Sequence, residues 1–379
     1  MKKHKQEQQP TATAGLPDAA LVEILSRVPY KSLCRFKCVS KPWLALCSDP
    51  NLRKRCPQTL SGFFYNKSSS GLSFRNLSGR GGAPMVDPSL PFLRGRYQRV
   101  EVEQSCGGLL LCKYWQSYKG RNKKKYGYAV CNPATGQWIV LTLIVLPDPV
   151  DGVPVIYDGT YEFFLAFDAA NPSRFVVFAP LTNCFGEFAQ VAIFSSETRR
   201  WTSVENELGY KTVLVGKPEC VLLNGTMHLA THRGTIATVD MEGKVWGEIE
   251  MPDDTPDVSN YTSIGQSQGR LYAWQIDNDK DCKLCVWVLE DYRTGKWTLK
   301  HTVNVSEIFG RRLDEDEHSY TMFAIHPDRN LVFLNDGEDM TVSYDMDNRK
   351  VSVISSSRSD FVDGALYVPC FEEWSSQGH

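Results

Sequence analysis

The chain has 379 residues, 42% of them hydrophobic, which predicts a small module plus one large domain or two medium ones. Its formal net charge of −2 gives no overall attraction to nucleic acid or to an anionic membrane. The longest apolar run, residues 139–146, is far shorter than the roughly 20 residues of a membrane-spanning helix. We therefore expect a soluble protein that binds neither nucleic acid nor membrane. The twelve cysteines follow no regular pairing, and the polar N-terminus has no secretory pattern, which favours free thiols in a reducing compartment.

Residues 1–14 are polar and predict a disordered tail, as do residues 372–379 at the other end. The first helix is predicted between Asp18 and Pro29, because an acid suits a first helical turn and proline has no N–H to continue a helix. The apolar side chains of this segment recur at helical spacing and so form one stripe: Leu21, Ile24, Leu25 and Val28.

Two more short helices are predicted before residue 55. One starts near Ser32, and the other starts at Ser40, where Pro42 suits the first turn. A unit of about 40 residues is near the lower limit for burying its own core. Its apolar stripe therefore marks either a docking surface or a cap on the domain that follows, and spacing alone leaves both interpretations open.

The order of these residues resembles an F-box, whose pattern is leucine-proline, isoleucine-leucine, a second proline and a terminal lysine-x-tryptophan. The resemblance covers residues 15–55 and implies that the module binds the Skp-type adaptor of a cullin-based ubiquitin ligase by a helix-in-groove contact. The adaptor-binding residues that it implies are Leu16, Pro17, Leu21, Ile24, Leu25, Val28, Pro29, Leu33, Phe36, Val39 and Trp43.

From about residue 59 to residue 371 the pattern changes to short apolar runs separated by Gly, Asn, Asp and Pro, which is typical of β-strands and turns. A unit of about 50 residues recurs, as in a kelch-like propeller. Each copy has one apolar residue directly after a tight turn: Trp138, Trp201, Trp246, Trp297 and Val351. We predict a mixed fold, a small helical module followed by an all-β propeller of six or seven blades in which the two chain ends share one blade. A pair of β-sandwiches is the alternative.

The segments SCGGLLLC and NPATGQW resemble the F-box-associated, kelch-like propeller of plant F-box proteins. Together the two resemblances imply a substrate-recognition subunit of a Skp–cullin–F-box ligase, which brings an unknown target protein to ubiquitination in the cytoplasm or nucleus. The alternatives are an F-box scaffold outside the ligase and a ligand-binding or sugar-binding propeller with an incidental helical cap.

No residues with the pattern of a catalytic, cofactor or metal site stand out. Ser267 lies in a G-x-S-x-G sequence, but a strand follows it where a hydrolase needs a helix. Cys282 and Cys285 have zinc-like spacing without a second ligand pair, and His228 and His232 lie in a predicted strand and turn. We expect a non-catalytic protein without a cofactor or a metal.

Target binding is expected on loops, which carry the variable side chains of a propeller. The two most distinctive loops are residues 114–128 and 309–320, and each is equally compatible with a solvated hairpin tip. The candidate contacts on them are Trp115, Tyr118, Arg311 and Arg312, because buried aromatic residues and arginines dominate interface energy.

Overall fold

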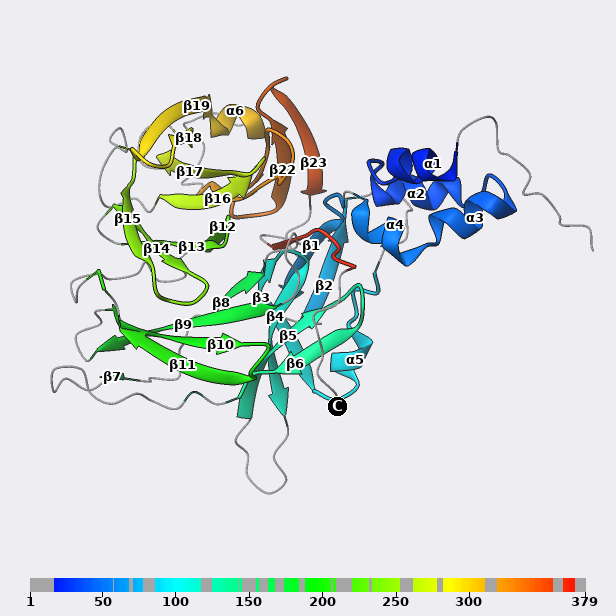
Figure 1. Ribbon diagram of the computed structural model, residues 1–379. Helices are drawn as coiled ribbons and strands as arrows, with labels where there is room; N and C mark the ends of the chain where they lie inside the picture. The colour runs from blue at the N-terminus through cyan, green and yellow to red at the C-terminus, as the bar shows by residue number, and fades with distance from the viewer. Residues whose placement is uncertain are drawn as a thin grey trace, which may run out of the picture. The chain divides into compact units, whose positions relative to one another are not determined.

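The computed structural model divides the chain into two compact units, residues 1–59 and residues 60–379 (Figure 1). It describes residues 17–56, 58–67, 71–77, 86–116, 125–142, 144, 155–156, 163–167, 174–183, 188–205, 207–208, 220–231, 234–252, 262–277, 282–310, 319–356 and 364–371. Both predicted tails lie outside these residues. Within the described part of the chain, no helix is both long and apolar enough to cross a membrane.

The first unit is helical. Its described residues form α1 (Asp18–Leu25), α2 (Tyr30–Phe36), α3 (Lys41–Cys47) and α4 (Pro50–Arg55). The predicted start of α3 is confirmed, since the Ser40 hydroxyl accepts a hydrogen bond from the Trp43 N–H at 3.4 Å. The sequence predicted three helices, and the structure adds α4.

The first two helices differ from their predicted bounds. Helix α1 ends at Leu25, so Val28 lies in the turn that follows, where the N–H of Arg27 donates to the Ile24 oxygen at 3.2 Å. This tight i to i+3 bond closes the helix before Pro29. Helix α2 starts at Tyr30, two residues before the predicted position, because Pro29 takes the N-cap position.

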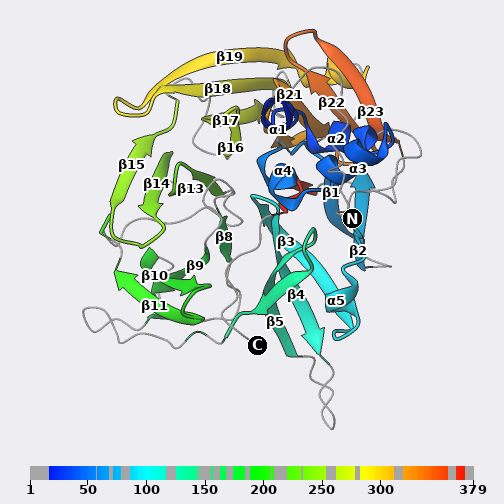
Figure 2. The same ribbon diagram turned by 45° about the vertical axis from the view of Figure 1, so that its right-hand side comes forward.

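The second unit contains six sheets within its described residues, arranged around a ring (Figure 2). We number them as blades 1 to 6. Blade 1 is β24 (Ala365–Tyr367), β1 (Gly62–Lys67) and β2 (Gly71–Asn76). Blade 2 is β3 (Arg99–Cys106), β4 (Leu109–Gln116), β5 (Lys125–Asn132) and β6 (Gln137–Val140). Blade 3 is β8 (Phe164–Phe167), β9 (Phe175–Asn183), β10 (Phe188–Ser195) and β11 (Arg200–Glu205), with β7 (Val155–Ile156) also paired to β9.

The remaining blades have four strands each. Blade 4 is β12 (Cys220–Leu223), β13 (Thr226–Ala230), β14 (Thr235–Asp240) and β15 (Trp246–Glu250). Blade 5 is β16 (Ser263–Ser267), β17 (Arg270–Asp277), β18 (Lys283–Asp291) and β19 (Lys296–Asn304). Blade 6 is β20 (Thr321–Ile325), β21 (Leu331–Asn335), β22 (Met340–Asp345) and β23 (Lys350–Ser356). Two short helices lie between strands: α5 (Pro91–Arg94) precedes β3, and α6 (Val305–Phe309) follows β19.

The ring closes as the sequence predicted, because the two ends of the β-unit share blade 1. Strand β24 pairs antiparallel with β1, with Tyr367 opposite Gly62 and Ala365 opposite Phe64. The backbone N–H of Ser61 also donates to the Tyr367 oxygen at 2.9 Å. Closure of this kind leaves a propeller only short strand edges.

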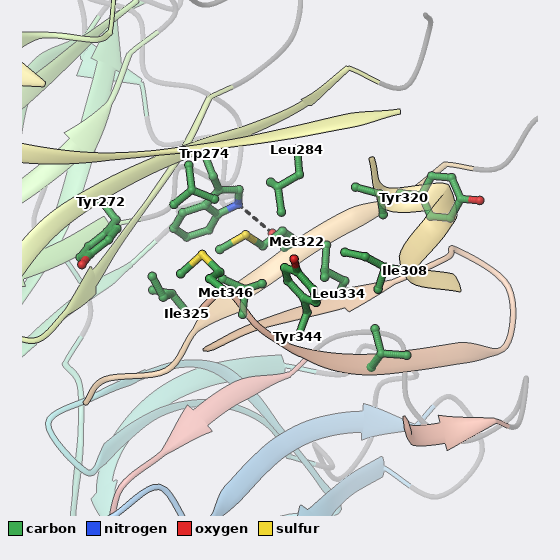
Figure 3. Packing of buried hydrophobic residues seen from close by; sticks show 14 of the residues in the cluster. Tyr272, Trp274, Leu284, Ile308, Tyr320, Met322, Ile325, Leu334, Tyr344 and Met346 are labelled. Carbon is green, nitrogen blue, oxygen red and sulfur yellow. Dashed lines mark hydrogen bonds between the residues drawn. The ribbon is translucent and has the colours of Figure 1, made fainter. Parts of the chain in front are cut away.

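Each pair of neighbouring blades has its own hydrophobic core, which accounts for six clusters around the ring. Leu111 of blade 2 and Leu165 of blade 3 share one cluster, for example, and both are fully buried. Figure 3 shows the cluster between blades 5 and 6, where the Trp274 indole donates to the Met322 oxygen at 2.9 Å. Because alternate side chains of a strand face opposite sides, inner strands covered on both faces are apolar at nearly every position. The succession of blades confirms the propeller over the sandwich pair.

The predicted anchor residues stand at or next to the start of the outermost strand of five blades, after a tight turn. They are half-buried or exposed rather than part of the innermost core, and Val351 is 37% exposed. Two of the tryptophans bond to the preceding blade. Trp201 donates to the Thr142 oxygen at 2.9 Å, just past β6, and Trp297 donates to the Glu250 oxygen at 2.8 Å, at the end of β15.

Candidate functional site

The helical unit has a small core of its own. Leu25, Leu33, Cys47 and Leu52 are each at most 2% exposed, so all four helices contribute to it. The thiol of Cys56 donates to the Leu25 oxygen at 3.3 Å, which holds the end of the unit against the end of α1. Burial of these apolar side chains is what stabilises helices this short, because isolated helices of six to eight residues are unstable in water.

Three large apolar side chains of the same unit remain exposed. Ile24 is 51% exposed, Leu44 is 49% exposed and Val39 is 62% exposed. Full burial of a Leu or Ile side chain stabilises a protein by about 1.5 to 3 kcal/mol relative to its exposure to water. Exposure of these three side chains therefore lowers the stability of a unit whose size allows only a small core. We therefore take these three exposed side chains as the candidate interaction surface of the unit.

The structure divides the predicted adaptor-binding residues into two groups. Leu25 and Leu33 are buried in the core of the helical unit, so their side chains hold the helices together and are not exposed for contact. The residues with accessible surface are Pro17, Leu21, Ile24, Val28, Pro29, Phe36, Val39 and Trp43. Leu16 lies outside the described residues. The sequence analysis missed Leu44, which the apolar content of α3 would have indicated.

Two local contacts set the shape of this surface. The rings of Phe36 and Trp43 meet edge to face with centroids 5.7 Å apart, which joins α2 to α3. Glu23 accepts from Arg27 at 2.9 Å and from Arg55 at 2.6 Å, and these two hydrogen bonds hold the pKa of its carboxyl below the usual value. Because these charged groups are exposed, they orient the side chains and contribute little to stability.

The predicted target-binding residues are described only in part. Trp115 lies near the end of β4, half-buried, with the Arg99 guanidinium 5.2 Å from its ring centroid. Tyr118, Arg311 and Arg312 lie outside the described residues.

The sequence motifs that suggested chemistry lie at structural positions. Ser267 is fully buried at the end of β16 and donates to the His326 oxygen at 2.7 Å, so its hydroxyl is not presented as a nucleophile. Cys285 lies beside Thr302, with the sulfur 3.8 Å from the threonine hydroxyl. Among the described residues, no three His, Cys, Asp or Glu side chains converge as metal ligands.

His228 is also structural. Its imidazole is fully buried, with Nδ1 3.1 Å from the Val221 oxygen and Nε2 2.8 Å from the Tyr292 hydroxyl. A carbonyl can only accept, so Nδ1 carries the proton and Nε2 accepts from Tyr292. Burial lowers the pKa of His228, and the ring therefore joins blades 4 and 5 as a neutral group. His232, which the sequence analysis considered together with His228, lies outside the described residues.

Comparison with known proteins agrees with this division into two units. Residues 14–55 match the model of the F-box domain, and residues 174–376 match the model described as F-box protein At3g26010-like, beta-propeller. The second match covers the region from β9 of blade 3 through blade 6 to the closing strand β24.

Similar full-length proteins come from Arabidopsis thaliana. F-box protein DOR is 31% identical over 334 residues, which cover 79% of this chain and 77% of the relative. F-box protein At5g49610 is 29% identical over 314 residues, which cover 78% of this chain and 81% of the relative. Putative F-box/kelch-repeat protein At1g15680 is 24% identical over 391 residues, which cover 93% of this chain and 86% of the relative. The similarity to these relatives thus extends through most of both chains.

Proposed function

Because this chain belongs to the plant F-box proteins that carry an At3g26010-like β-propeller, we propose that it is the substrate-recognition subunit of a Skp–cullin–F-box ubiquitin ligase. In this proposal the helical unit binds a Skp-type adaptor, the adaptor brings the cullin, and the propeller holds the target protein. The chain forms and breaks no bonds. It raises the effective concentration of target lysines near the conjugating enzyme.

The observation that carries the proposal is the exposed apolar surface of the helical unit. Ile24, Val39 and Leu44 lie on a unit that already has its own core, so they do not serve its folding. A partner that buried them would regain the free energy that their exposure forgoes.

Co-purification with a Skp-type adaptor tests this proposal. Ile24→Asp and Val39→Asp each place a charge on the exposed apolar surface, and burying an unpaired carboxylate against a partner is strongly unfavourable. We expect each variant to lose the adaptor from pulldowns of the full chain. Val245→Asp is the matched control, because Val245 is a 68% exposed valine on blade 4, and this variant should retain the adaptor. Adaptor binding by Ile24→Asp equal to that of the parent would overturn the proposed surface.

The cullin separates the ligase from a scaffold role. A chain that captures the adaptor together with cullin acts as a ligase subunit, whereas capture of adaptor alone, with no cullin under conditions that preserve the ligase, favours a scaffold. We also propose a location in the cytoplasm or nucleus, where reducing conditions suit cysteines that form no disulfide with one another among the described residues.

A further inference from the structure

One face of blade 2 begins in a core and ends at the surface. On this face Leu109, Leu111 and Val130 are fully buried in the cluster shared with blade 3. Because side chains two apart on a strand share a face, the same face continues along β4 to Lys113 and Trp115. In Figure 2 the hairpin of β4 and β5 reaches the lower edge of the ring, so this end of the blade lies at the edge of the propeller.

The outer end of the face carries two cross-strand rows of three side chains. In one row Arg99 of β3 lies opposite Trp115 of β4, which lies opposite Tyr126 of β5. In the other row Glu101 lies opposite Lys113, which lies opposite Tyr128. We call these six residues the blade 2 face.

Cations and aromatic rings alternate within the blade 2 face. The Lys113 ammonium lies 4.4 Å from the ring centroid of Tyr126, 5.6 Å from that of Trp115 and 5.8 Å from that of Tyr128. The Arg99 guanidinium lies 5.2 Å from the Trp115 centroid. These distances are within the range of cation–π attraction, so the side chains hold one another in place before any partner arrives.

The charge of the blade 2 face is positive. Its single acid, Glu101, is only 17% exposed and is paired with Arg99, whose side chain is 51% exposed. Lys113 is then the uncompensated charge of the six residues. An approaching group therefore meets the Lys113 charge beside the exposed ring of Tyr126.

We propose that the blade 2 face is a docking site for an acidic, extended segment of the target protein, an inference that rests on the proposed function. Carboxylates of the segment pair with Lys113 and with the exposed part of Arg99, and an apolar or aromatic side chain lies against Trp115 and Tyr126. The positive charge accelerates the encounter, while the rings provide the contact area.

A single-stranded RNA is the other polymer that basic and aromatic residues commonly bind. Glu101 pairs with Arg99 and leaves Lys113 as the uncompensated cation of the six residues, whereas single-stranded nucleic acid is bound by a positively charged groove that follows its backbone. The blade 2 face therefore fits a peptide better. RNA is therefore an outcome of the test rather than part of the proposal.

The test uses the purified full chain and a displayed library of random 12-residue peptides. We expect the enriched peptides to carry several Asp or Glu residues and an apolar or aromatic residue. A synthetic copy of one enriched peptide should bind about tenfold more weakly to Lys113→Glu and to Trp115→Ala than to the parent, and its affinity should fall with added salt. Arg96→Glu is the matched control, because Arg96 is an exposed cation 5.2 Å from the Trp138 ring of the same blade but lies outside the blade 2 face.

The proposal would be overturned by enrichment of peptides without net negative charge, by unchanged binding to Lys113→Glu, or by tighter binding of a 12-residue uridine RNA than of the selected peptide. Adaptor pulldown with the same variants keeps this inference separate from the proposed function, since a variant that loses the peptide and retains the adaptor affects target docking alone. Loss of peptide binding in Arg96→Glu to the same degree would also contradict the assigned site.

Discussion

The indole N–H of Trp297 in blade 5 donates to the backbone oxygen of Glu250 in blade 4 at 2.8 Å, and it does so at the outer rim of the propeller. Trp201 makes the corresponding bond from blade 3 to the oxygen of Thr142 after blade 2. These tryptophans therefore connect neighbouring outermost strands, whereas Trp274 connects neighbouring blades from an inner strand.

We predict that Trp297→Phe destabilises the propeller by about 0.5 to 1.5 kcal/mol, because phenylalanine keeps the ring but loses the hydrogen bond to Glu250. Trp297→Ala should cost more, roughly 1 to 3 kcal/mol. This value is below the usual loss for a fully buried aromatic, because Trp297 is only half-buried. Denaturant unfolding of the three proteins measures both values. Equal stability of the phenylalanine variant and the parent would show that the interblade bond contributes nothing.

A second prediction concerns Tyr367 in β24, the strand that closes the ring. Tyr367 is fully buried, its ring meets Phe64 edge to face at 5.1 Å, and its hydroxyl has no hydrogen-bond partner among the described residues. Tyr367→Phe removes this unpaired polar group, so it should leave the free energy of unfolding unchanged or raise it by about 1 kcal/mol. Tyr367→Ala should lower it by about 3 to 5 kcal/mol, since it leaves a cavity between blades 1 and 2. A phenylalanine variant less stable than the parent by more than 1 kcal/mol would contradict the unpaired state of the hydroxyl.

The helical unit allows a comparison of a buried and an exposed residue. Leu33→Ala should lower the stability of the unit by about 2 to 5 kcal/mol, because Leu33 is fully buried. Ile24→Ala should change it by less than about 1 kcal/mol, because half of the Ile24 side chain is already in water. Hydrogen exchange of the backbone amides of α1 to α3 measures this difference without interference from the propeller. Equal loss of protection in the two variants would place Ile24 in the core.

Stability should also depend on pH through His228. Burial lowers the pKa of this histidine below its ordinary value of 6.5, so the unfolded chain binds the proton more readily than the folded one. The contribution of His228 is therefore fully present above pH 6.5 and is lost as the pH falls below that value through the lowered folded pKa. His228→Gln retains a donor for Val221 but does not titrate in this range.

Denaturant unfolding at pH 7.5 and pH 5.5 checks this prediction. The parent should lose more stability between these two values than His228→Gln does. Burial also lowers the pKa of His301 and His326, so part of the pH dependence should remain in the variant. An identical loss in both proteins would mean that His228 is not responsible for any of it.

The local features of this protein follow from short stretches of its sequence. Ser40 and Pro42 begin α3, Pro29 separates α1 from α2, and the Gly107–Gly108 pair makes the turn between β3 and β4, where both residues have positive φ. Such features depend on backbone restrictions that act over a few residues, and so the helical module, the strands and the repeat were predictable.

Tertiary structure decided what depends on residues far apart in the chain. The number of blades was open between six and seven until the pairing of Gly62 with Tyr367 closed the ring. The burial of the α1 stripe was also decided by tertiary structure, since Leu25 is buried and the adjacent Ile24 is half exposed. Helical spacing shows which side of a helix is apolar, but it does not show which of these side chains another part of the protein covers. The blade 2 face also arises only from strand register, which places Arg99 beside Trp115 and Lys113 beside Tyr128. Strand register and side-chain burial are set by contacts between residues far apart in the chain, so a local sequence pattern does not determine them.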